Sequence, residues 1–227
     1  MKLVGISLSP YFERAVITLD VKEALGQVEL ALPPANFGTP EARAINPTGK
    51  IPYLLLPDGS FLPEGQVIAE YFNDVFSGPD LMPSDPMQAA RARLLCRTID
   101  LYVGPHTSAL ARTITRGMRD EDAIRQAVEE GLPLGLDLLE SHLSGGEYAV
   151  GDAFSFGDAA LIPHMFHFLV FLKEFDVDVF GDRPKLAAWW DKHKESDIML
   201  RSHERMQAAL DFFLARIRAA QENAAAQ

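Results

Sequence analysis

The most informative segment of the sequence is NPTGKIP at residues 46–52, which is followed by PEG at residues 63–65. Pro52 stands at the entrance of a short apolar run, where a proline cannot donate to a β-ladder. The Ile51–Pro52 bond is therefore a candidate for the cis form, which would turn the Ile51 backbone outward. An outward N–H and C=O could then pair with a peptide-like ligand as an added strand does. A trans proline at a strand edge is the alternative, and the spacing alone leaves both interpretations open.

A small sheet with packed helices is predicted around this segment. Ser9 and Pro10 indicate a helix start, because serine suits the N-cap and proline suits the first helical position. Two apolar runs on either side of the turn sequence PDGS indicate a β-hairpin. The predicted order is strand, helix, strand, irregular loop, hairpin and helix, over residues 2–7, 9–26, 28–32, 33–46, 51–62 and 66–76.

The second half of the chain is predicted to be helical. It begins after a stretch dense in proline, aspartate and serine, and beyond that stretch apolar residues recur at helical spacing. Pro105 and Pro133 are expected to bend or break their helices. We therefore predict an N-terminal domain over residues 1–78, a linker over residues 79–87 and an all-helical domain over residues 88–227.

Charge and composition limit the partners. The chain has 21 Lys and Arg against 32 Asp and Glu, and this net charge of -11 argues against nucleic acid and acidic membrane surfaces. The first residues lack a secretory pattern, and the longest uncharged run, residues 159–172, is shorter than the roughly 20 residues that a membrane helix needs. The single cysteine suits a reducing compartment. We expect a cytoplasmic protein without membrane or nucleic-acid partners.

Several residues that resemble site residues are better interpreted as structural. Ser155 and Asp158 have the spacing of a capping box before an apolar run. Cys96 has no CxxC partner, so we expect it inside a helix rather than in thiol–disulfide exchange. His164 and His167 lie three residues apart on one predicted helix face, but the histidines show no known metal-ligand spacing. We predict no metal.

Three segments occur in order along the chain: SPYFERAV, then NPTGKIPYL with LPEGQVIAEYF, then YAVGDAFSFGDAAL. Taken together, they resemble the glutathione transferase superfamily, in which an α/β thioredoxin-like domain precedes an all-α domain. The resemblance covers nearly the whole chain. It implies a glutathione transferase that takes glutathione as co-substrate, acts on a small hydrophobic electrophile in detoxification, and forms a homodimer. A glutathione-dependent isomerase, lyase, dehalogenase or peroxidase, and a non-catalytic binding protein, are the alternatives.

The resemblance implies that Ser9 is the catalytic residue. A serine hydroxyl can donate to a sulfur anion, and the N-terminus of a helix also favours thiolate over thiol. Thiolate is the nucleophilic form of sulfur. The alternative is that Ser9 serves only as an N-cap. Ser7 and Tyr11 are the other candidate hydroxyls.

The resemblance also implies a glutathione site made of Lys50, Ile51, Pro52, Glu64 and Gly65. Lys50 would attract the glycyl carboxylate, although a solvated surface lysine is an equal alternative. Ile51, held by a cis Pro52, would pair with the cysteinyl backbone. Glu64 and Gly65 would bind the γ-glutamyl end, with Glu64 accepting from the ammonium group.

The chain departs from the family pattern at Gly65, where a serine usually follows the glutamate. The missing hydroxyl would cost on the order of 1.5–3 kcal/mol of binding unless the Gly65 N–H or Gln66 replaces it. An apolar second substrate is expected between the two domains. Its candidate contacts are Tyr11, Tyr102 and His106, and more weakly Asn36 and Phe37.

Overall fold

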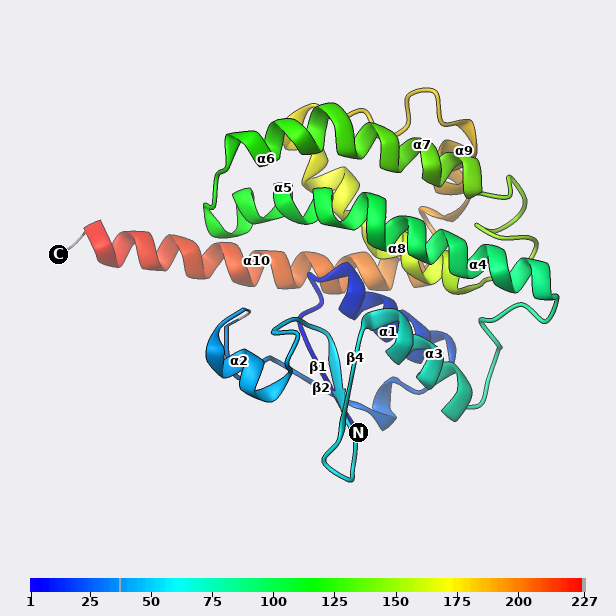
Figure 1. Cartoon of the computed structure of the whole chain (residues 1–227), viewed down its shortest axis with the longest axis horizontal. Helices are drawn as coiled ribbons and strands as arrows, with labels where there is room; N and C mark the ends of the chain where they lie inside the picture. The colour runs from blue at the N-terminus through cyan, green and yellow to red at the C-terminus, as the bar shows by residue number, and fades with distance from the viewer. Residues whose placement is uncertain (37, 226–227) are drawn as a thin grey trace.

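The computed structural model describes residues 1–36 and 38–225, with side chains described up to residue 219. Figure 1 shows a small sheet with its helices on one side of the molecule and a bundle of helices on the other. The long last helix lies between the bundle and the sheet for part of its length and then extends beyond both. The predicted order of a mixed α/β part followed by an all-helical part is confirmed.

The sheet has four strands in the order β2-β1-β3-β4. β1 is parallel to β2 and antiparallel to β3, and β3 pairs with β4 as the predicted hairpin. β1 is shorter than the apolar run at residues 2–7 suggested, because the Ser9 N–H donates to the Ile6 carbonyl and turns the chain soon after the strand. The strands are β1 (Lys2–Val4), β2 (Glu29–Ala31), β3 (Tyr53–Leu55) and β4 (Phe61–Pro63).

Helix α1 (Pro10–Val21) is the element on which the two parts meet. It packs against α3 (Gly65–Val75) beside the sheet and against α8 (Phe156–Val170) of the bundle. Because α1 is covered on both sides, even its charged residues Glu13 and Arg14 are buried. A short 3-10 turn, Leu25–Gln27, leads to β2, and α2 (Pro40–Ile45) interrupts the loop before β3.

The prolines in the bundle do not end their helices. Pro105 and Pro133 each lie in the first turn after a π-helical segment, and the chain stays helical through both places. A wider π turn accommodates a proline that cannot donate to the preceding turn. The helices concerned are α4 (Pro86–Thr98), the π segment Ile99–Val103, α5 (Gly104–Arg116), α6 (Glu121–Gln126), the π segment Ala127–Gly131 and α7 (Leu132–His142).

Helix α8 forms the centre of the bundle. Its first thirteen residues are all buried, and the predicted capping box at its start is confirmed. Asp158 also accepts from the Ala149 N–H at 2.8 Å and from Trp189 Nε1 at 2.9 Å. The remaining elements are a 3-10 turn (Leu172–Phe175), α9 (Pro184–His193) and α10 (Asp197–Ala225). None of the described helices is long and apolar enough to cross a membrane.

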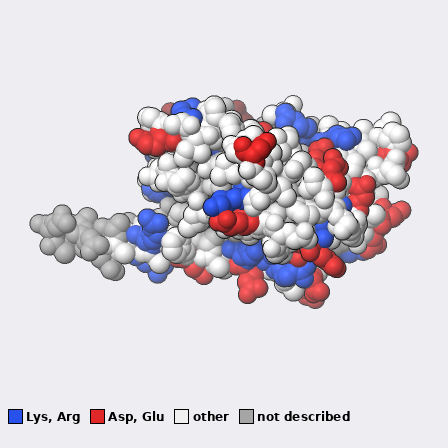
Figure 2. All heavy atoms as spheres, turned by 90° about the horizontal axis from the view of Figure 1, so that it is seen from below, with Lys and Arg blue, Asp and Glu red and all other residues white. Residues whose placement is uncertain are grey.

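Ion pairs join α1 to the bundle. Arg14 is fully buried, and its Nη2 lies 2.7 Å from the carboxylate of Asp100. Buried Glu13 pairs with Arg205 at 2.6 Å. On the face shown in Figure 2, acidic and basic side chains are interspersed, so that face presents no broad area of one sign.

Candidate functional site

A cleft of about 700 Å³ lies between the sheet half of the molecule and the bundle. It is lined from the turn before α1, the loop before β3, the start of α3, and helices α4, α5, α8 and α10. This placement brings together residues that are far apart in the sequence. The predicted site residues that line it are Ser9, Tyr11, Lys50, Ile51, Pro52, Glu64 and Gly65.

Ser9 occupies the N-cap position of α1, but its side chain does not cap the helix. Its backbone is extended, with φ -81° and ψ 119°, and its carbonyl accepts from the N–H groups of Phe12 and Glu13. The hydroxyl makes no capping hydrogen bond and lines the cleft. It is therefore available to a ligand at a helix N-terminus, where the partial positive charge favours an anion.

His167 supports this turn from the bundle side. Its Nε2 lies 2.9 Å from the carbonyl oxygen of Leu8, the residue before Ser9. Because a carbonyl can only accept, Nε2 must carry the proton. Burial lowers the pKa of His167 to about 4, so the ring is neutral near pH 7. From the sequence, a place in the core or in the second-substrate pocket was favoured for this histidine over a metal site. Its helical spacing gave no signal of the contact with Leu8.

The two other candidate hydroxyls are placed differently. Ser7 does not line the cleft, and its hydroxyl hydrogen-bonds the Glu13 carboxylate. Tyr11 does line the cleft, but its hydroxyl lies so close to Gly104 that a Cβ there would collide with it. Burial raises the pKa of Tyr11 to about 12. Tyr11 thus packs α1 against α5, which leaves Ser9 as the one of the three candidate hydroxyls that is open to the cleft.

At the start of α3 the backbone itself is unusual. Glu64 has φ 73°, in the left-handed region that favours glycine, and such a conformation costs of order 1–3 kcal/mol in a non-glycine residue. A Cβ at Gly65 would collide with the carbonyl oxygen of Tyr11. The absence of the family's usual serine therefore has a steric reason. Gln66 lines the cleft, but its amide is already bonded to Arg14 at 3.1 Å and to Glu70 at 3.0 Å.

The loop before β3 holds the opposite side of the cleft. The Ile51–Pro52 bond is cis, as the sequence suggested. Buried Asn46 fixes the loop, because its amide donates to the Lys50 carbonyl at 2.9 Å while its Oδ1 accepts from the Thr48 N–H at 3.2 Å. Sequence reasoning did not assign Asn46 this role.

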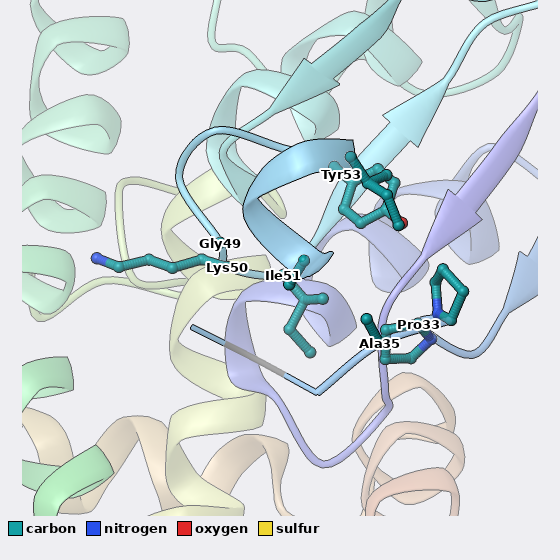
Figure 3. Close-up of a pocket in the computed structure, with 9 residues that line it drawn as sticks. Pro33, Ala35, Gly49, Lys50, Ile51 and Tyr53 are labelled. Carbon is teal, nitrogen blue, oxygen red and sulfur yellow. The ribbon is translucent and has the colours of Figure 1, made fainter. Parts of the chain in front are cut away.

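Lys50 and Ile51 also border a second, much smaller hollow. It has a volume of about 10 Å³, which is room for about one water molecule. Figure 3 shows the Lys50 side chain extending away from the other labelled residues of this hollow. The hollow is therefore too small for a ligand such as a peptide, and Lys50 also lines the larger cleft.

Four charged residues of the continuous helical stretch from α4 through the π segment to α5 line the cleft. The sequence did not predict them as site residues. Asp100 binds Arg14 through both carboxylate oxygens, at 2.7 and 3.3 Å. The other three are arginines, and together with Lys50 they make the cleft basic in an acidic chain. They are Arg97, Arg112 and Arg116.

Tyr102 and His106 do not line the cleft. Tyr102 is 45% exposed on the π segment, and the His106 ring rests against Gly131. Asn36 is also absent from the lining, and Phe37 lies outside the described residues.

In the part of the chain that the structure describes, no group of three or more His, Cys, Asp or Glu could hold a metal. Cys96 is buried, and burial raises the pKa of its thiol to about 12.

The fold and the cleft define a class of protein in which a thioredoxin-like domain and an all-α domain enclose one cleft. Comparison with known proteins agrees with this class. Residues 8–75 match the model of the glutathione S-transferase N-terminal domain, and residues 122–191 match that of the C-terminal domain. The chain belongs to the glutathione transferase superfamily.

Individual relatives support the same family. The chain is 29% identical to a glutathione S-transferase of Pseudomonas putida, over 96% of this chain and 98% of that protein. It is 34% identical to the probable glutathione S-transferase BZ2 of Zea mays, over 70% and 68% of the two chains. A crystal structure of maleylacetoacetate isomerase from Methylobacterium extorquens AM1, with bound malonate and GSH, shares the fold. It has a TM-score of 0.73 and 24% identity, over 89% and 96% of the two chains.

Proposed function

We propose that the protein is a glutathione transferase in which the Ser9 hydroxyl stabilises the glutathione thiolate for attack on an electrophile. The observation that carries this proposal is the uncommitted Ser9 hydroxyl at the start of α1, in the same cleft as the Ile51 backbone. The hydroxyl donates to the sulfur anion, and the helix N-terminus adds partial positive charge. Both lower the thiol pKa, so more of the nucleophilic form is present near pH 7.

Glutathione is proposed to lie along the loop before β3 and the start of α3. The Ile51 backbone pairs with the cysteinyl residue, as an added strand would. Lys50, which points away from the small hollow, holds the glycyl carboxylate. Glu64 accepts from the γ-glutamyl ammonium group, and the Gly65 N–H donates to the γ-glutamyl carboxylate. The amide of Gln66 contributes indirectly, since it holds Arg14 beside this end.

An aryl chloride serves as the example electrophile. The glutathione sulfur forms a bond to the ring carbon, the carbon–chlorine bond breaks, and chloride leaves with the electron pair. The thiol proton passes to solvent before attack. No oxidant or reductant is needed. The protein contributes by positioning the two reactants and by stabilising the thiolate.

Replacing Ser9 with Ala tests the proposal. We expect kcat/KM for 1-chloro-2,4-dinitrobenzene to fall on the order of 100-fold, because the variant loses the hydrogen bond that stabilises the negative charge on the glutathione sulfur. The pKa of bound glutathione, followed by ultraviolet absorbance of the thiolate, should rise in the same variant. Ser7→Ala is the matched control, because Ser7 does not line the cleft. Equal effects of Ser9→Ala and Ser7→Ala would rule out Ser9 as the catalytic group.

A glutathione-dependent isomerase is the second candidate. The related fold of a maleylacetoacetate isomerase and the basic residues of the cleft both favour considering it. Product analysis separates the two reactions, because an isomerase returns glutathione unchanged and a transferase consumes it. We propose in addition that the protein is cytoplasmic and forms a homodimer. Light scattering at micromolar concentration measures the oligomeric state directly.

A further inference from the structure

The wall that α5 contributes to the cleft has an unusual set of side chains. Ser108, Arg112 and Arg116 succeed one another at intervals of four residues, so they lie on one face of that helix. All three line the cleft. The sequence of α5, GPHTSALARTITR, contains no aspartate or glutamate. We call these three residues the α5 basic wall.

Within the α5 basic wall, Arg112 has no matching negative charge among the residues that the structure describes. Arginines one turn apart on a helix repel each other. Among the described residues, neither Ser108 nor Arg112 has a hydrogen-bond or ion-pair partner. The described acids that line the cleft are Glu64 and Asp100, and Asp100 is already held by Arg14. A basic cluster of this kind, in a chain with a net charge of -11, suits an anionic ligand.

The positive charge of the α5 basic wall is also more than the two carboxylates of glutathione require. Glutathione has two carboxylates, for which the proposed binding mode already uses Lys50 and the Gly65 N–H. Phe171 and Phe213 line the same cleft from the region of α8 and from α10, and supply apolar contacts. The cleft therefore combines a basic wall with aromatic side chains. That combination fits a ligand with an apolar body and one acidic group.

We propose that the second substrate is an electrophile that carries a carboxylate, which Arg112 binds with help from Ser108. The Arg112 guanidinium supplies charge-assisted hydrogen bonds to the carboxylate. The apolar body lies against Phe171 and Phe213, within reach of the sulfur. This inference rests on the proposed function. It narrows the class of second substrate from any apolar electrophile, as expected from the sequence, to an apolar electrophile with an acidic group. The bond changes are those of the aryl chloride reaction above.

Two aryl chlorides that differ in one group test the proposal. The measured quantity is the ratio of kcat/KM for 4-chloro-3,5-dinitrobenzoate to that for neutral 1-chloro-2,4-dinitrobenzene. In Arg112→Gln this ratio should fall about tenfold, as expected for the loss of one charge-assisted hydrogen bond at an exposed position. Arg112→Lys should recover part of it, because the charge remains without the planar fork. The control is Arg93→Gln, an exposed arginine of α4 outside the cleft, and it should leave the ratio unchanged.

Two outcomes would overturn the inference. The first is a ratio that is the same in Arg112→Gln and in the wild type. The second is a higher KM for glutathione in Arg112→Gln without any change in the ratio, which would assign Arg112 to the glycyl carboxylate of glutathione. In both cases, turnover of the neutral chloride by the wild type would still support the proposed transferase function.

A binding experiment separates the inference from the reaction. Calorimetric titration of the glutathione-saturated protein uses 3,5-dinitrobenzoate and 1,3-dinitrobenzene, which have no leaving group. We expect the wild type to bind the benzoate more tightly, and Arg112→Gln to lose that preference about tenfold. If neither chloride is turned over but this preference is seen, the transferase proposal fails and the anion site stands. If the wild type shows no preference, the anion site fails.

Discussion

His167 is a single residue that links the bundle to the turn carrying Ser9. Its Nε2–H donates to the Leu8 carbonyl, while its Nδ1 is buried and has no partner among the described residues. Such a ring can accept a second proton only at a cost, which is why burial lowers the pKa of His167 to about 4. The same cause lowers the pKa of neighbouring His164. The geometry beside Ser9 therefore depends on a neutral histidine.

This histidine predicts a loss of stability in acid. The pKa of His167 is about 4 in the folded protein and near 6.5 in the unfolded chain, so the unfolded state binds more protons between these values. The free energy of unfolding should fall as pH drops from 6.5 to 4, with His167 contributing roughly 3 kcal/mol of that fall. His167→Gln retains a donor for Leu8 and does not titrate, so its fall should be smaller. Urea unfolding at several pH values measures both. Parallel curves for the two proteins would contradict the account.

Gly65 gives a second prediction at this scale. Gly65→Ser restores the residue that the family usually has, but its Cβ meets the Tyr11 carbonyl oxygen. We expect the variant to lose about 1–3 kcal/mol of stability, because backbone atoms must move apart to admit the side chain. We also expect no gain in glutathione affinity. Urea unfolding and calorimetric titration check the two parts. A variant of unchanged stability with tighter glutathione binding would show that the steric argument is wrong.

At the scale of the element, the start of α8 shows how one carboxylate orders several segments. Asp158 is buried, and it accepts from the Ser155 N–H, the Ala149 N–H and Trp189 Nε1. It therefore ties the helix to the preceding loop and to α9. The same helix carries His167, so the position of Ser9 depends indirectly on this cap.

Asp158→Ala should consequently be far more damaging than an ordinary cap deletion. It leaves three buried N–H donors without an acceptor, at about 1–3 kcal/mol each, so we expect a loss of at least about 3 kcal/mol. Asp85→Ala is the matched control. Asp85 caps α4 with one hydrogen bond at the surface, and its removal should cost about 1 kcal/mol. Urea denaturation of both variants gives the comparison. Similar losses in the two would mean that the cap does not act beyond its own helix.

The whole molecule shows which parts of the site a sequence can reveal. The positions of Ser9, Ile51 and Glu64 at the cleft were predictable because short local motifs carry these residues, and each motif fixes its own turn or helix start. The positions of Arg112 and His167 at the cleft were not predictable, because they depend on how distant helices are rotated against α1. Tyr102 shows the physical reason. It follows buried Ile99 by three residues, which is the spacing of one face in a regular α-helix, but the π segment widens the turn and changes the helix phase.

The structure of the protein with bound glutathione tests the central claim most directly. The account predicts that the sulfur lies within hydrogen-bonding distance of Ser9 Oγ, while the cysteinyl backbone pairs with the Ile51 backbone. A sulfur placed at the Tyr11 or Ser7 hydroxyl, or a tripeptide bound away from Ile51, would contradict it.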